Sequence, residues 1–276
     1  MKLLQNLHTH TTYCDGKDTP EQMIMAAIEK GFLSIGFSGH SYVDFDEIAS
    51  MSMEETEQYK KEVRALAQKY KDKIKVYCGI EYDFYSNFDI SDFDYTIGSV
   101  HALKIGDRYF GIDHSMNKTI ELVKNHFGGN GYAFAKAYYE TLAELPSRGK
   151  FDIIGHFDLV TKYRDKVAFF NGESKQYRDL ALGAVSALKG KIPLFEVNSG
   201  AIGRGYRTTP YPDEFLVKEL KKQGFGAVIT SDCHNSSWLD IGYKNALELL
   251  EECGYKEIYY LTDEGFKAES IKEQKR

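Results

Sequence analysis

Short apolar segments recur along the chain, and longer segments with helical periodicity separate them. The apolar segments predict buried strands at residues 3–7, 34–38, 75–81, 95–101, 151–156, 193–198 and 227–231. The amphipathic segments predict helices at 20–31, 52–70, 118–125, 133–144, 174–189 and 213–223, a last helix that ends near residue 250, and then a strand at 257–261. Alternation of this kind predicts a parallel sheet with right-handed crossovers.

The length and the turn residues decide between the architectures that this alternation allows. A chain of 276 residues forms one large α/β domain or two small ones, and no linker-like or repeated segment divides it. No Gly-x-Gly-x-x-Gly follows the first strand, which disfavours a dinucleotide-binding open sheet. We therefore predict a single α/β domain over residues 1–276, with the fold of a TIM-like (β/α) barrel.

Composition and charge exclude several classes of partner. A formal net charge of −6 counts against a nucleic-acid binder, which normally carries a basic patch, so the many Tyr and Phe residues are assigned to packing. The N-terminus becomes polar too soon for a signal peptide, and no apolar run is long enough to span a membrane. The four cysteines are scattered, as in reduced proteins. We expect a cytoplasmic protein whose oligomeric state the sequence leaves open.

A series of imidazole and carboxylate side chains follows the predicted strands at their carboxyl ends. His8 and His10 point to the same face of the first strand, because successive side chains alternate between faces. The full series is His8, His10, Asp15, His40, Glu81, His101, His156, Asp232 and His234. In a barrel these positions share the rim at which such enzymes assemble their active sites. Six of the eight histidines lie in this series, although chance placement would scatter them.

Taken singly, each of these residues has an ordinary structural explanation. A histidine after a strand is commonly a packed core or rim residue, and an aspartate such as Asp15 suits a turn. Together at one rim they indicate a metal centre, and their nitrogen and oxygen donors suit two or three divalent ions of zinc, iron or manganese. Such ions would make the pocket positive and favour an anionic substrate such as a phosphomonoester. Four further residues are left out of the donor set: Cys14, Cys233, His114 and His126.

With these residues in this order, the chain resembles the polymerase and histidinol phosphatase (PHP) superfamily of metal-dependent phosphoesterases. The motifs that carry the resemblance are the His8-x-His10 opening, His40, Glu81, His101, His156 and the closing Asp232-x-His234. The resemblance covers nearly the whole chain and implies a distorted (β/α)7 barrel with a trinuclear centre, in which Glu81 and Asp232 span more than one ion. Segments 6–21, 79–83, 97–101 and 195–212 are most similar to the monofunctional histidinol-phosphate phosphatases.

This resemblance implies the reaction of histidine biosynthesis in which L-histidinol phosphate is hydrolysed to L-histidinol and phosphate by a metal-bridging hydroxide. Asp232 or His234 would move a proton to or from the reacting oxygens. The loop after the sixth strand offers Arg204 and Arg207 to the phosphate, since an arginine fork matches phosphate oxygens. The alternative for either arginine is a solvated surface position.

Further candidates for substrate contacts follow the fifth strand and the loops around it. Lys162 or Arg164 would add a cation beside the phosphate. An amine and an imidazole in the substrate would need acidic or aromatic partners, for which the candidates are Asp158, Asp83 and Tyr206.

Two other functions stay open at this point. The first is a PHP-type phosphoesterase that acts on a nucleotide or another phosphomonoester. The second is a metal-binding or regulatory protein that keeps the fold without turnover. The complete donor series argues against the second function, because a lapsed enzyme is expected to lack some of its ligands.

Overall fold

The computed structural model describes residues 4–46 and 49–274. Its central feature is a sheet of seven strands, all paired in parallel, in the order β1-β2-β3-β4-β7-β8-β9. These strands are β1 (Gln5–Asn6), β2 (Ser34–Phe37), β3 (Lys75–Asp83), β4 (Tyr95–Ser99), β7 (Ile153–Ile154), β8 (Leu194–Asn198) and β9 (Gly226–Thr230). They correspond to the seven strands predicted from the sequence. The first of those predictions begins at residue 3, which lies outside the described residues.

The first and last strands of the sheet meet at their carboxyl ends. Beyond β1 and β9, Thr9 and Cys233 form a parallel bridge. In this bridge the His10 amide donates to the Cys233 carbonyl at 3.0 Å, and the Cys233 amide donates to the His8 carbonyl at 3.3 Å. The sheet therefore curls into a barrel, and the predicted TIM-like architecture is confirmed.

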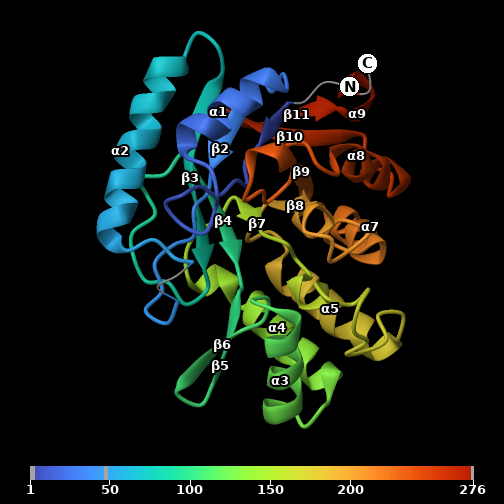
Figure 1. The fold of residues 1–276 in the computed structure, drawn as a ribbon. Coiled ribbons are helices and arrows are strands. Elements are labelled where there is room, and N and C mark those ends of the chain that lie inside the picture. Colours follow the sequence, from blue (N-terminus) through green and yellow to red (C-terminus); the bar gives the residue numbers. More distant parts are fainter. Residues whose placement is uncertain (1–3, 47–48, 275–276) are drawn as a thin grey trace.

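Helices cover the outside of this barrel (Figure 1). The helices of the described residues are α1 (Pro20–Glu29), α2 (Met53–Tyr70), α3 (Met116–His126), α4 (Gly131–Ala143), α5 (Lys175–Leu188), α6 (Gly200–Gly203), α7 (Glu214–Lys222), α8 (Tyr243–Glu252) and α9 (Ile271–Gln274). Within residues 4–46 and 49–274, three short 3₁₀ turns lie at η1 (Leu145–Ser147), η2 (Leu159–Thr161) and η3 (Ser236–Trp238). Thr19 and Ser52 each form the capping box that their sequences predict. None of the helices among the described residues is long and apolar enough to cross a membrane.

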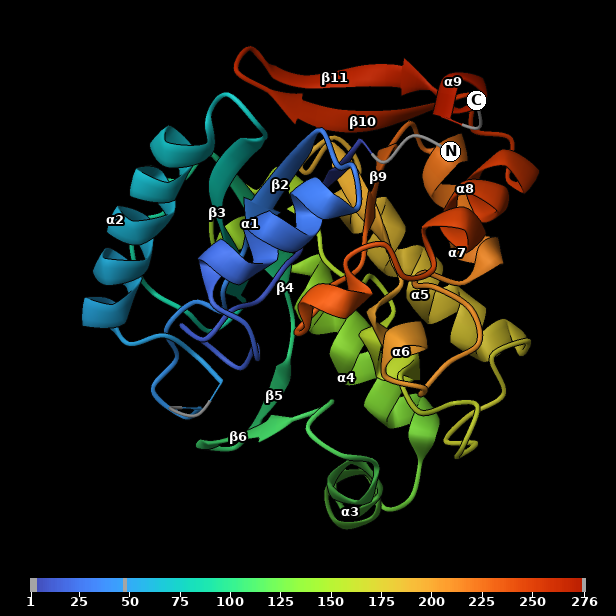
Figure 2. The same cartoon turned by 45° about the horizontal axis from the view of Figure 1, so that its top comes forward.

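The amino-terminal half of the barrel is filled by side chains and closed by a hairpin. The Tyr95 ring crosses the interior, and its hydroxyl donates to the carbonyl oxygens of Leu7 and Phe37. A Cβ at Gly79 would lie 2.3 Å from that ring, so only glycine fits beneath it. The hairpin of β10 (Glu257–Thr262) and β11 (Gly265–Ser270) packs over this end (Figure 2).

Two features of the fold differ from the prediction. The stretch 106–131, predicted to be irregular apart from one short helix, also contains part of a hairpin of β5 (Ala102–Ile105) and β6 (Arg108–Gly111). The strand predicted at 257–261 exists as β10, but it pairs antiparallel with the unpredicted β11 and stays outside the seven-stranded sheet. Both hairpins are local additions to the barrel, so they leave the order of its strands unchanged.

Candidate active site

The predicted donor series converges at the carboxyl end of the barrel, around the carboxylate of Glu81. This side chain ends β3 and is 1% exposed. Its Oε2 lies 3.1 Å from His8 Nε2 and 3.0 Å from His40 Nδ1. Its Oε1 lies 3.0 Å from His156 Nε2 and 3.2 Å from His101 Nε2. Residues from five strand ends therefore meet at one carboxyl group.

Asp232 faces the same cluster from the end of β9. Its Oδ1 lies 3.4 Å from His10 Nε2 and 3.8 Å from His8 Nε2. The residue has a φ of +46°, in the left-handed region that side-chain-bearing residues seldom adopt. Such a conformation costs on the order of 1 kcal/mol or more and persists where the surroundings enforce it. The fold thus uses backbone strain to aim this carboxylate at the histidines.

Asp15 completes the arrangement on the solvent side. Its Oδ1 lies 3.1 Å from His234 Nε2, 3.6 Å from His40 Nε2 and 3.8 Å from His10 Nδ1. The nine residues of the predicted series therefore lie together. Within the described residues, three groups have donor atoms that all lie within 4.8 Å of one another: His10, Asp15, His40 and His234; His8, His10 and Asp232; and His40, Glu81 and His101.

The donor atoms fit divalent ions. His8 Nε2, His10 Nε2 and Glu81 Oε2 are buried and have no hydrogen-bond partner within the described part of the chain. Leaving buried polar atoms unpaired is costly, and here the unpaired atoms face one another. Imidazole nitrogens and carboxylate oxygens are the usual ligands of zinc-type ions. The donor atoms are therefore of the kind and in the positions that could hold divalent ions.

The electrostatics of the cluster also suit cation binding. Burial, together with the neighbouring imidazoles of His234 and His40, lowers the pKa of His10 to about 3, so this ring is neutral and keeps a free lone pair. Burial alone would raise the pKa of Glu81, but the imidazoles of His8, His101 and His40 hold it well below its ordinary range. Glu81 is therefore ionised at neutral pH.

Two acidic residues form hydrogen bonds with histidines of the donor set, and the sequence analysis predicted neither of them in that role. Glu196, in β8, is fully buried, and its Oε2 accepts from His8 Nδ1 at 2.8 Å while its Oε1 accepts from the His156 amide at 2.6 Å. Asp83 accepts from the amide of His101 and lies 3.2 Å from its Nδ1. Such partners fix the orientation and tautomer of a ligating histidine. The signal available in the sequence was an acid inside the apolar segment 193–198.

Seven of the nine predicted donors, all except His8 and His10, line a cavity of about 360 Å³. Arg204 also lines it, with Nη2 at 2.9 Å from Asp232 Oδ2 and Nη1 at 3.0 Å from His234 Nδ1. Lys162 also lines the cavity, and its Nζ is 3.0 Å from Asp113 Oδ2. These two side chains bring positive charge beside the donors.

Arg207 and Asp158, predicted as substrate contacts, do not line this cavity. Arg207 is 3% exposed, and its guanidinium donates to Thr161 Oγ1 at 2.6 Å and to Asp213 Oδ1 at 2.6 Å. Asp158 is also buried, with Oδ2 at 3.6 Å from Arg207 Nη1 and 3.1 Å from the Asp213 amide. Arg207 and Asp158 therefore belong to a buried ionic network, which stabilises the loop that carries Arg204.

The four residues that the prediction left out of the donor set differ in their placement. Burial raises the pKa of the Cys14 and Cys233 thiols to about 12, so both are neutral at physiological pH. His126 lies in α3, where its ring packs 4.2 Å from that of Phe110. His114 lines the outer part of the cavity.

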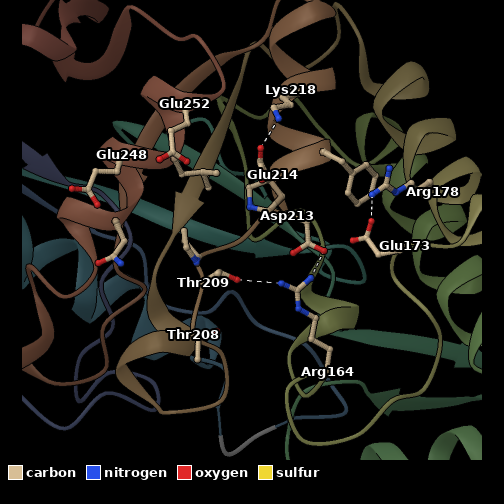
Figure 3. Close-up of a pocket in the computed structure, with 15 residues that line it drawn as sticks. Arg164, Glu173, Arg178, Thr208, Thr209, Asp213, Glu214, Lys218, Glu248 and Glu252 are labelled. Atoms are coloured by element: carbon tan, nitrogen blue, oxygen red, sulfur yellow. Dashed lines mark hydrogen bonds and ion pairs between the residues drawn. The ribbon is translucent and has the colours of Figure 1, made fainter.

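A second and larger cavity, of about 660 Å³, lies between α5, α7 and α8 (Figure 3). Its walls carry paired charges, such as Arg164 with Asp213 and Arg178 with Glu173. None of the nine predicted donors lines it. The smaller cavity is the candidate active site, because seven of the nine predicted donors line it.

A family model described as the PHP domain matches residues 6–200 of the chain. The chain belongs to the PHP domain family. The matched segment begins just before His8 and includes seven of the nine donors; Asp232 and His234 follow it.

Individual members of this family align with most of the chain. A histidinol-phosphatase of Bacillus subtilis is 26% identical over an alignment of 269 positions, which covers 89% of this chain and 98% of the relative. A structure of the Lactococcus lactis histidinol phosphate phosphatase, solved with zinc, L-histidinol and phosphate, has a TM-score of 0.74 at 20% identity, covering 97% of this chain and 100% of the other. A structure of a histidinol phosphatase from Listeria monocytogenes has a TM-score of 0.76 at 22% identity, and the match covers 87% of this chain and 98% of the other. These structures confirm the fold.

Proposed function

We propose that this PHP protein is a metal-dependent phosphatase that hydrolyses L-histidinol phosphate to L-histidinol and phosphate. The observation that carries the proposal is the set of unpaired, buried donor atoms of His8, His10 and Glu81, together with the guanidinium of Arg204, which lies 2.9 Å from the Asp232 carboxylate. The names of its aligned relatives, which extend over most of the chain, support the choice of substrate.

The nine residues of the donor series would hold two or three divalent ions, with Glu81 and Asp232 central because each faces several histidines. Zinc, iron and manganese all accept these nitrogen and oxygen donors. When bound, such ions act as Lewis acids that lower the pKa of water and withdraw charge from phosphoryl oxygens.

Other side chains would bind the phosphate and move protons. Arg204 lines the cavity, and its fork can donate two parallel hydrogen bonds to phosphate oxygens. Burial alone would raise the pKa of Asp232, but Arg204 and the nearby imidazoles hold it well below its ordinary range. Asp232 is therefore ionised at neutral pH. Asp232 and His234, which contact the same guanidinium, are the candidates to move a proton to or from the reacting oxygens.

A substrate panel with controlled metal content tests this proposal. The protein is stripped with a chelator, reloaded with zinc, manganese or iron(II), and assayed for phosphate release from histidinol phosphate, a nucleoside monophosphate and phenyl phosphate. We expect activity only after reloading, with the highest kcat/KM for histidinol phosphate. Equal kcat/KM values for all three esters would reject the substrate. Turnover by the stripped protein would reject the metal dependence.

A further inference from the structure

The proposed substrate carries an ammonium group. Six carboxylates of the described residues line the cavity, and they differ in how strongly other groups of the protein already bind them. Asp15, Glu81 and Asp232 lie among the imidazoles of the donor set. Asp83 accepts hydrogen bonds from His101 and from the amide of Tyr85. The question is which carboxylate stays available to a cation that enters from solvent.

Asp113 is engaged by a buried lysine. Its Oδ2 lies 3.0 Å from Lys162 Nζ, which also donates to the Asp113 carbonyl at 2.9 Å. Lys162 is 7% exposed, so separating the pair would leave a buried ammonium without its partner, which is strongly unfavourable. Asp113 is therefore not free to bind a second cation.

Asp46 is the carboxylate that remains among the described residues lining the cavity. Its Oδ1 accepts a hydrogen bond from the Ala49 amide at 3.2 Å, while its Oδ2 lies 3.4 Å from His114 Nε2. The His114 side chain is 44% exposed, and that of Asp46 is 20% exposed. A contact of this kind between exposed groups contributes little free energy, so an incoming ammonium can replace it.

Aromatic contacts hold Asp46 at the mouth of the cavity. The adjacent Phe45 stacks on Tyr109 of β6, with ring centroids 4.3 Å apart and an interplanar angle of 11°. His114 packs against Gly111, where a Cβ would lie 2.2 Å from its ring. Phe45 is thus attached to the β5–β6 hairpin, and Phe45, His114 and Trp238 all line the cavity that Asp46 lines.

We propose that Asp46 is the specificity-determining residue that binds the ammonium group of the substrate; this inference rests on the proposed phosphatase function. A phosphate at the buried donors and Arg204 directs the rest of an extended substrate toward the more exposed end of the cavity. Lys17, Lys162 and Arg204, which line the same cavity, suit the phosphate, whereas Asp46 suits the amine. The site therefore selects aminoalkyl phosphates over neutral phosphate esters.

The variant Asp46→Asn removes the charge but keeps the Oδ1 acceptor for the Ala49 amide, so the turn is retained. Three substrates are compared: histidinol phosphate, the same ester without its amine, and phenyl phosphate. We expect Asp46→Asn to lower kcat/KM for histidinol phosphate by about ten- to a hundredfold, the range for a hydrogen bond to a charged group. The other two substrates should change by less than about twofold, since neither presents an ammonium group.

Asp44→Asn is the matched control, because Asp44 is an exposed acid on the same loop that does not line the cavity. This control should leave all three kcat/KM values unchanged. Binding of L-histidinol, followed by fluorescence of Trp238, the only tryptophan in the chain, should weaken in Asp46→Asn and not in Asp44→Asn.

The outcomes separate the two proposals. An equal loss on all three substrates, or an Asp46→Asn enzyme that still prefers the amine-bearing ester as strongly as wild type, would overturn the role of Asp46. Wild-type enzyme that hydrolyses phenyl phosphate as well as histidinol phosphate would overturn the proposed function itself.

Discussion

The two ends of the barrel are built from the same strands but in opposite ways. At the amino-terminal end, Tyr95 fills the interior and its hydroxyl bonds two backbone carbonyls, while the β10–β11 hairpin covers the opening. At the carboxyl end, His8, His10 and Glu81 are equally buried but keep unpaired polar atoms. One end satisfies its polar groups and stabilises the fold, whereas the other leaves them for a ligand.

The largest expected effect comes from removing a donor at the carboxyl end. His8→Ala should lower phosphate release by about a thousandfold or more, because loss of one ligand disrupts shared metal binding. Metal content by elemental analysis should fall with activity. His126→Ala removes a histidine from α3, outside the cavity, and should leave both measurements unchanged. Full activity in His8→Ala would contradict the assignment of the donor set.

A smaller effect, on metal affinity, is expected from a change at Glu196, which accepts a hydrogen bond from the donor residue His8. Glu196→Gln keeps the shape of the side chain but replaces the charged acceptor of His8 Nδ1, and loss of such a partner typically weakens metal affinity about ten- to a hundredfold. The metal affinity of the variant is measured by competition with a chelator of known affinity. Glu121→Gln, on the exposed surface of α3, is the control. The prediction fails if affinity is retained and only the melting temperature changes.

Protons should compete with metal at the carboxyl end. Burial lowers the pKa of His8 and of His101, but the surrounding carboxylates outweigh it and hold both above the ordinary value of 6.5. A bound metal ion must displace these protons. The apparent metal affinity should therefore fall by about tenfold for each unit by which the pH is lowered, for each proton displaced. Calorimetry in buffers of different ionisation enthalpy counts the protons released. Metal binding without proton release would show that the imidazole rings of His8 and His101 are already neutral in the metal-free protein.

The same shifts predict opposite pH slopes for the two forms of the protein. In the metal-free protein, raised histidine pKa values contribute stability below pH 6.5, and this stability is lost as the pH rises through the folded-state pKa. In the metal-loaded protein the slope reverses, because deprotonated rings bind the ions. Thermal unfolding between pH 6 and 9, with and without chelator, measures both slopes.

The smallest effect is expected at the amino-terminal end. Tyr95→Phe removes a hydroxyl that bonds the Leu7 and Phe37 carbonyls, so unfolding free energy should fall by about 1–2 kcal/mol with kcat and KM unchanged. Denaturant unfolding measures this change. Tyr42→Phe, at an exposed position, should leave the unfolding free energy unchanged. A large loss of activity in Tyr95→Phe would show that the two ends are not independent.

The sequence predicted the barrel and the donor series because both follow from local pattern. Apolar segments alternating with amphipathic helices define parallel strands, and polar residues directly after such strands share one rim. The structure brings the predicted donors together for this reason. The role of these donors as ligands remains a prediction.

The two hairpins were harder to predict. The β5–β6 segment has a turn signal at Gly106, which has a φ of +63°, but its strands are short and half exposed, so their alternation is weak. The β10 strand has an apolar pattern like that of the barrel strands. Only its packing shows that it caps the barrel instead of joining the sheet.

The sequence by itself determined the order of the strands and the chemical identity of the rim, because strand periodicity and chain order act over short distances. Tertiary structure alone decided which charged groups reach the cavity. Arg204 and Arg207 are three residues apart, yet Arg204 meets Asp232 in the cavity while Arg207 is bound by Asp213 and Thr161. Contacts between residues that are distant in the chain form only when the barrel closes. The pairing of Lys162 with Asp113, which leaves Asp46 available, is one of these contacts.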